Sequence, residues 1–280
     1  MRNTTFIVYM TLTADSGSTK TTWMVEQGGG KRLFHTQGLN PFHQTAEEMR
    51  RIVTVELLGQ EGFPDAATMS NIHFYGAGCT AEKSPLLRAI LRDAFPSAAE
   101  VEVGSDILGA ARALLGSSEG IACILGTGAN SCLYDGERIV HNVSPMGYIL
   151  GDEGSGAVIG RTFVNLLYKG GHEDMVKTFE EETGLTLADV IQRVYREPMP
   201  NRFLASLAPF IKRQLGEVWV EEMVTDCFRL FFRRNVAHYH RPELPCSFVG
   251  SIAFYFMGQL CDAAKKEGFL IGKVMKEPLS

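Results

Sequence analysis

The stretch ADSGSTKTTW, residues 14–23, carries side chains that could bind an anion. Apolar, strand-like runs stand before and after it, so we expect a tight turn between two antiparallel strands. Glycine lets the backbone approach a ligand closely, and a turn rich in Gly, Ser and Thr can direct N–H groups and hydroxyls at an anion. The candidate phosphate ligands of this first turn are Asp15 (through a metal), Gly17, Ser18, Thr19 and Lys20.

A second turn of the same character, LGTGAN at 125–130, joins two further strand-like runs. Its candidate ligands are Gly126, Thr127 and Gly128. Two such turns facing each other could hold a polyphosphate from both sides. Asp15 would repel phosphate directly, so we expect its carboxylate to hold Mg²⁺, partly through water, while Lys20 adds positive charge. Turns of this composition are also common without any ligand, so neither is specific alone.

Two better-known nucleotide motifs are absent. No G-x-x-x-x-G-K-[ST] sequence occurs, because GGGKR at 28–32 lacks both the leading glycine and the final Ser or Thr. The dinucleotide fingerprint G-x-G-x-x-G is missing from both turns. A P-loop and a Rossmann site are therefore excluded as explanations of the turns.

The elements around the turns form two similar halves. In the first half, the patterns predict strands over 6–14, 21–27, 31–36, 72–75 and 100–103, with helices over 46–58, 85–94 and 107–115. Thr45 and Glu48 form a capping-box pattern at the first helix. In the second half we expect strands over 120–126, 131–134, 138–141 and 246–250, and helices over 155–167, 186–196, 203–215, 217–239 and 254–267.

Each half opens with a three-stranded meander and continues with helices and strands. This repeat predicts a duplicated α/β architecture with a cleft between the halves. GSSEG at 116–120 interrupts the pattern, which divides the chain into domains at 1–116 and 117–280.

The composition narrows the class of protein. The chain has 280 residues, 45% hydrophobic and 21% charged, as in a soluble globular protein with a full core. The net charge of −5 argues against a nucleic-acid partner. No apolar run reaches the ~18 residues of a membrane span, and no signal peptide is evident. Six cysteines without a CxxC pair indicate reduced, buried thiols in a cytoplasmic protein.

Four ordered segments carry a family resemblance: DSGSTKTTW, ILGTGANSCLYDG, MGYILGDEGSG and FVGSIAF. Together they resemble the N-acetylglucosamine kinase branch of the sugar kinase/Hsp70/actin superfamily, over Thr13 to about Lys276. The resemblance implies duplicated actin-like ATPase (ribonuclease H-like) domains, ATP and Mg²⁺ as cofactors, and a possible homodimer. It makes the two turns the phosphate-1 and phosphate-2 loops and puts Gly250 and Ser251 in the adenosine region.

The same resemblance implies an amino-sugar site and phosphorylation at the 6-position. Asn40, in TQGLNP, matches a sugar-binding asparagine, and Asp106, in a D-x-x-x-A run, matches the catalytic aspartate. Asp152, in GDEGSG, matches a residue that bonds sugar hydroxyls. Beside Asp152 stand Met146, Gly147 and Tyr148.

Chemistry gives Asp106 an independent role. An attacking alcohol must lose its proton, and a carboxylate within hydrogen-bond reach can accept it as general base. The alternative is structural, because Asp106 could stabilise the N-terminus of its helix. Asp152 and Glu153 could likewise form an acidic first helical turn.

Other functions stay open at this point. The fold also resembles activator ATPases of 2-hydroxyacyl-CoA dehydratases, which share an iron–sulfur cluster between cysteines of two subunits. A third possibility is a sugar-binding protein without turnover. Two departures from the family bear on this: Ser16 and Ser18 replace glycines of the first loop, and the sequence stops at GKVMKEPLS, where relatives commonly continue into a last helix. Without that helix, we expect looser interdomain closure.

Overall fold

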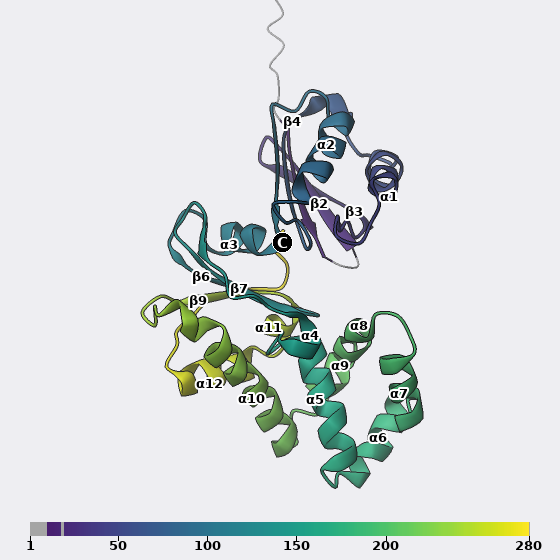
Figure 1. The fold of residues 1–280 in the computed structure, drawn as a ribbon, viewed down its shortest axis with the longest axis vertical. Helices are drawn as coiled ribbons and strands as arrows, with labels where there is room; N and C mark the ends of the chain where they lie inside the picture. The colour runs from purple at the N-terminus through teal and green to yellow at the C-terminus, as the bar shows by residue number, and fades with distance from the viewer. Residues whose placement is uncertain (1–9, 18–19, 280) are drawn as a thin grey trace, which may run out of the picture. The chain divides into compact units, whose positions relative to one another are not determined.

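The structure is a computed structural model and describes residues 10–17 and 20–279 (Figure 1). The chain divides into two compact units, the first extending to Gly109 and the second from Ala110 to Pro278. The division falls inside a helix, α3 (Asp106–Leu115). The domain boundary at 116/117 stays a prediction.

The first unit is built on a five-stranded mixed sheet of order β3-β2-β1-β4-β5. The antiparallel meander β1–β2–β3 is followed by β4 and β5, which run parallel to β1. The predicted 6–14 strand is described from Met10 onward. The strands are β1 (Met10–Ser16), β2 (Lys20–Gln27), β3 (Gly30–Gln37), β4 (Met69–Gly76) and β5 (Glu100–Ser105).

Helices pack on this sheet and complete the first core. The capping box of Thr45 and Glu48 is confirmed at the start of α1. The helix expected to reach residue 58 instead continues as a π-helical turn. Trp23, fully buried, lies 5.7 Å from the Phe74 ring and donates its indole N–H to Thr36 at 3.0 Å. The other elements are α1 (Ala46–Arg51), η1 (Ile52–Leu57), η2 (Ala66–Thr68) and α2 (Ser84–Ala94).

The second unit repeats this topology. Its sheet has the order β10-β9-β6-β7-β8, with an antiparallel meander β6–β7–β8 and two further strands parallel to β6. Read from the meander outward, both sheets have the same strand order and directions, so the predicted duplicated α/β architecture is confirmed. The strands are β6 (Gly120–Leu125), β7 (Ala129–Tyr134), β8 (Ile139–His141), β9 (Cys246–Val249) and β10 (Ile271–Met275).

Helices α5, α10 and α12 lie on one side of this sheet (Figure 1). Three predicted helices are each broken in two, since the chain turns at Ser206–Leu207, at Asn235 and at Phe256. Two helices, α4 and α6, were not predicted. The helices are α4 (Gly147–Leu150), α5 (Gly156–Lys169), α6 (Glu173–Thr183), α7 (Leu187–Tyr195), α8 (Pro200–Ala205), α9 (Ala208–Arg213), α10 (Val218–Arg234), η3 (Val236–Tyr239), α11 (Ser251–Tyr255) and α12 (Met257–Glu267).

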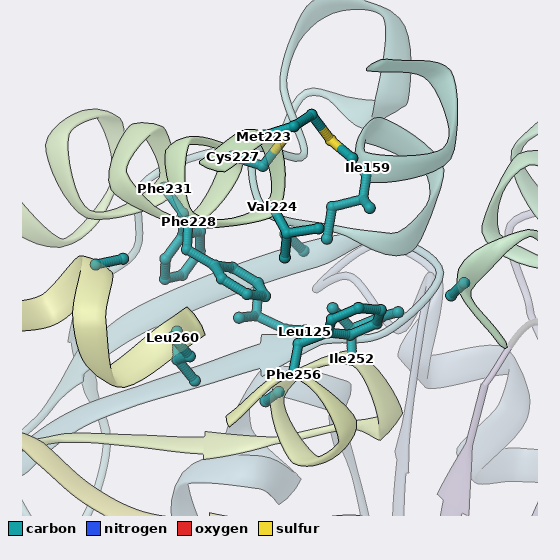
Figure 2. Packing of buried hydrophobic residues seen from close by; sticks show 14 of the residues in the cluster. Leu125, Ile159, Met223, Val224, Cys227, Phe228, Phe231, Ile252, Phe256 and Leu260 are labelled. Atoms are coloured by element: carbon teal, nitrogen blue, oxygen red, sulfur yellow. The ribbon is translucent and has the colours of Figure 1, made fainter. Parts of the chain in front are cut away.

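Aromatic side chains dominate the second core. Phe228 and Phe231 of α10 point toward Leu125 of β6, with α11 and α12 closing the cluster (Figure 2). Phe231, Phe232 and Phe248 contact one another with ring centroids about 6 Å apart, in edge and tilted geometries that favour aromatic pairs. Five of the six cysteines are buried as expected, but Cys261 is exposed.

We predict that Phe228→Ala lowers the free energy of unfolding by about 3–5 kcal/mol, because the lost ring leaves a cavity in a close-packed core. Val218→Ala, at a position 70% exposed on the same helix, is the matched control and should change it by less than about 0.5 kcal/mol. Denaturant unfolding followed by circular dichroism measures both. Equal effects of the two substitutions would contradict this packing.

Candidate active site

Three parallel strands of the first unit end at the same level. Ser16 of β1 lies opposite Gly76 of β4, which lies opposite Ser105 of β5. The segments that follow these residues therefore leave the sheet at one edge. In α/β sheets, ligands bind outside the carboxyl ends of parallel strands. The residues gathered there form the first-unit cluster: Asp15, Gly17, Lys20, Asn40, Gly78, Cys79 and Asp106.

The first turn joins β1 to β2 at this edge, as predicted. Gly17 donates its N–H to the Lys20 carbonyl at 3.1 Å. The hydroxyls of Ser16 and Thr21 meet at 2.7 Å, and both accept the N–H of Leu39. This buried network ties the base of the turn to the segment that carries Asn40. Ser18 and Thr19 lie outside the described residues.

Asn40 belongs to the first-unit cluster because of a glycine on the next strand. Gly78 follows β4 with φ +78°, and a Cβ there would lie 2.1 Å from Asn40 Oδ1. Only glycine combines this backbone conformation with the space that Asn40 fills. Gln44 fixes the backbone, since its Oε1 accepts the Asn40 N–H at 2.8 Å.

Asp106 is the first residue of α3 and follows β5 directly. Its Oδ1 accepts the N–H of Ile107 at 2.8 Å, and burial raises the pKa of its carboxyl. Cys79 follows β4 and Asp106 follows the neighbouring strand β5, so both lie at this edge. Burial, and secondly the charge of Asp106, raises the pKa of the Cys79 thiol to about 12. Asp106 thus stands at the start of a helix, as the structural alternative expects, and its carboxyl has increased proton affinity at the carboxyl edge of the sheet.

The second unit has a corresponding edge at the ends of β6 and β9. Ile124 lies opposite Val249 in the parallel ladder, so Gly126 and Gly250 leave the sheet together. Gly250 has φ +127°, and a Cβ there would lie 2.2 Å from the Leu125 carbonyl oxygen. A side chain at 250 would therefore force the start of α11, which begins with Ser251, away from the turn.

The second turn presents two of its N–H groups in one direction. The carbonyls of Gly126 and Thr127 accept the N–H groups of Gly156 and Ala157 in α5, at 2.8 and 3.1 Å. In a trans peptide the next N–H points opposite to the carbonyl. The N–H groups of Thr127 and Gly128 therefore both point away from α5, an arrangement that suits an anion.

Asp152 lies against this second turn. Its backbone has φ +53°, and its N–H donates to the Pro145 carbonyl at 2.9 Å. A Cβ on Gly128 would come 3.1 Å from Asp152 Oδ2, and the carboxylate accepts the N–H of Ala129. Burial raises the pKa of Asp152 to about 6, and the neighbouring charge of Glu153 adds to this effect. Two predicted sites, the second turn and Asp152, are thus brought together.

The predicted residues beside Asp152 lie in a short helical turn. Met146 and Gly147 have φ of +61° and +75° at the start of α4, and Met146 is 59% exposed. The carbonyl of Tyr148 accepts a hydrogen bond from the Arg161 guanidinium at 2.6 Å. The second-unit cluster consists of Gly126, Thr127, Gly128, Asp152, Gly250 and Ser251. Met146, Gly147 and Tyr148 are linked to it through the preceding Pro145, whose carbonyl accepts the Asp152 N–H.

The residues that hold these groups in place were not predicted in that role. Ser16, Thr21, Gln44 and Gly78 have no ligand-like pattern of their own. Their signal is local: hydroxyls at both ends of a turn, and a glycine directly after a strand. Their partners are distant in the sequence, so the pairing could not be derived from it.

The described residues hold no cluster of metal ligands. Among residues 10–17 and 20–279, no three His, Cys, Asp or Glu side chains are grouped around a common point. Within the same ranges, no helix has the length and apolar composition needed to cross a bilayer.

Comparison with solved structures identifies the family. The "Putative N-acetylglucosamine Kinase" from Porphyromonas gingivalis is 48% identical, with a TM-score of 0.90 over 96% of this chain and 95% of that one. This chain belongs to the N-acetylglucosamine kinase family. The resemblance in the ordered motifs is thereby confirmed.

More distant structures share the fold of this family member. A "Putative N-acetylglucosamine Kinase" from Chromobacterium violaceum is 18% identical, with a TM-score of 0.69 over 95% of each chain. A non-polymerising mutant of MamK bound to AMPPNP is 12% identical, with a TM-score of 0.51 over 96% of this chain and 94% of that one. The duplicated α/β fold is therefore of the actin-like type. Protein-family models and curated proteins gave no match.

We predict that Gly128→Ala destabilises the second unit, because the new methyl group would displace the Asp152 carboxylate from the Ala129 N–H. The loss of this bond should cost about 1–3 kcal/mol of unfolding free energy. Gly126→Ala, in the same turn with nothing within 4 Å of its Cβ, is the control. If both substitutions are neutral in denaturant unfolding, Asp152 does not pack on the turn.

Because the pKa of Asp152 is raised, we predict that Asp152→Asn increases the stability of the folded chain by an amount that depends on pH. A carboxyl with a folded pKa of about 6 instead of 3.8 disfavours the folded state when ionised, so its cost is full above pH 6 and disappears toward pH 4. The substitution should therefore stabilise the chain more at pH 8 than at pH 5. Melting temperatures at both pH values measure this, with exposed Asp262→Asn as control. A gain independent of pH would show that the carboxyl titrates normally.

Proposed function

We propose that this family member is an ATP-dependent kinase that phosphorylates an amino sugar, N-acetylglucosamine first, at the 6-hydroxyl. One observation carries the proposal: in each unit the predicted ligands, distant in sequence, gather at the carboxyl edge of the sheet. The 48% identity to the P. gingivalis protein supports the substrate class. The AMPPNP of the MamK structure supports ATP as phosphoryl donor.

The phosphates would be bound by the two turns. The N–H groups of Thr127 and Gly128 would bind phosphate oxygens, with Gly17, Ser18, Thr19 and Lys20 contributing from the first unit. Gly250 and Ser251 would contact the adenosine, since they leave the sheet beside the second turn. Water must be excluded during phosphoryl transfer, so that the phosphoryl group reaches the sugar instead.

Asp15 would hold Mg²⁺, and its donor set fits that ion. Mg²⁺ keeps several waters and is commonly bound by one or two carboxylates together with substrate phosphates, so a single half-buried aspartate at the end of β1 is sufficient. When bound, Mg²⁺ would neutralise charge on the phosphates.

Asp106 would be the general base. Its increased proton affinity favours removal of the proton from the attacking hydroxyl. Its place after β5 supports this role, because the segments that carry Asn40 and Cys79 reach the same edge of the sheet. Asn40 and Asp152 would bind vicinal hydroxyls of the sugar, and Met146, Gly147 and Tyr148 would border the site. Ionised Asp152 would offer only acceptor oxygens to these hydroxyls, whereas the protonated carboxyl would also donate.

We further propose a cytoplasmic homodimer, with the domains divided at 116/117. The six cysteines are all free thiols, which supports a reducing compartment.

An ADP-release assay with product analysis tests the activity on N-acetylglucosamine, glucosamine, N-acetylmuramic acid and N-acetylmannosamine. We expect turnover with N-acetylglucosamine and a 6-phosphate product. Asp106→Asn should lower kcat by about 10²–10⁴-fold, as for the loss of a general base, with little change in KM. Asp93→Asn, at an exposed position of α2, is the control. Absence of sugar-stimulated turnover by the folded protein, or full activity of Asp106→Asn, would refute the proposal.

A further inference from the structure

Glu153 directly follows Asp152, but its side chain belongs to a different network. Its carboxylate is only 13% exposed and reaches the end of α10. There Oε1 accepts a hydrogen bond from the Arg234 guanidinium at 3.1 Å, and Oε2 accepts one from the Asn235 side-chain amide at 3.2 Å. Both oxygens of a nearly buried carboxylate are thus used to bind one helix end.

Asn235 is the buried member of this network and is held by its own helix. It is 5% exposed, and its amide group also donates to the Phe231 carbonyl at 3.3 Å. Because the amide is held by its own helix, it has little freedom to follow Glu153. Glu153 is therefore anchored to the end of α10.

The backbone on both sides of Glu153 needs such an anchor. Asp152 has φ +53° and Gly154 has φ +75°, so Glu153 lies between two left-handed residues. For aspartate this conformation is disfavoured and persists where the surroundings impose it. Gly154 packs directly on α10, since a Cβ there would lie 3.1 Å from the Phe231 Cβ and 3.2 Å from the Phe228 ring.

We propose that Glu153 is a positioning residue that holds the Asp152 carboxylate against the second turn by clamping the Asp152–Gly154 bend onto α10. It takes no part in the chemistry and acts through Asp152. The inference rests on the proposed function only for the consequence in catalysis, that is, correct presentation of Asp152 to the sugar.

The structural consequence can be tested without substrate. Carboxyl-carbon NMR titration of Asp152 reports its surroundings, because its pKa is raised mainly by burial against the turn. In Glu153→Ala, the released bend should expose Asp152 and return its titration toward that of an ordinary aspartate. Glu153→Gln removes the charge but retains one acceptor for Arg234 or Asn235, so comparing the two variants separates loss of position from loss of charge.

The kinetic consequence is a split between KM and kcat. In Glu153→Ala, KM for the sugar should rise about 10- to 100-fold, as for misplacement of a binding group, while kcat and KM for ATP change little. In an Asp152→Asn background the same substitution should add nothing, because residues that act through one another are non-additive. Glu182→Ala is the matched control, since it removes a glutamate–arginine pair with Arg213, on α6 and α9. Its KM should equal that of the unmodified chain.

The outcomes are distinguishable. An unchanged Asp152 titration in Glu153→Ala, or a KM effect that adds fully to Asp152→Asn, would overturn the clamp. If Glu153→Ala does not fold, Arg234→Gln, which removes the 64%-exposed partner, should give a smaller rise in KM, and no rise would refute the inference. If no amino sugar is phosphorylated, the proposed function fails, while the NMR titration still decides whether Glu153 positions Asp152.

Discussion

Backbone hydrogen bonding between parallel strands is the constraint on which both clusters depend. The ladder keeps Ser16, Gly76 and Ser105 level, so the chain leaves the first sheet three times at one edge. A slip of one residue in such a ladder would move a strand end by about 3.3 Å and turn its side chains to the opposite face. The first turn and Asp106 would then no longer share an edge.

The second unit uses the same topology for a different distribution of groups. The parallel strands β6 and β9 again end at one edge, where each is followed by a glycine-containing segment. Here, however, N–H groups of α5 form hydrogen bonds with the carbonyls of the turn. In the proposed reaction, the base comes from the first unit and the directed N–H groups from the second. The duplicated fold thus has two equivalent sheet edges, and the proposed catalytic groups at the two edges differ.

The clusters contain several features that oppose folding. Two carboxyls, Asp106 and Asp152, lie where burial raises their pKa, and Asp152 also has a left-handed backbone. Strain of this kind persists only when the surroundings impose it. The aromatic core under the second turn, with Phe228 and Phe231 against Gly154, supplies the rigid support.

The sequence by itself determined the local elements and the identity of the chemical groups. Strand–turn–strand patterns, the Thr45 capping box and the duplicated order of elements could be predicted because they depend on short-range periodicity and hydrogen bonding. Asp106, Asn40 and Asp152 were found through motifs whose residues are neighbours in the chain. The short edge strand β10 was not found, since its residues are only partly buried and its pairing is irregular.

Tertiary structure alone decided which groups meet. The contact of Asp152 with Gly128, the closeness of Asn40 to Gly78, and the bond from Glu153 to Arg234, 81 residues away, have no local signal. Such contacts arise when helices pack on a sheet and bring remote segments together, and their free energy comes from burial of the whole core. Local patterns therefore named the reacting groups, while packing between distant residues set their positions and their proton affinities.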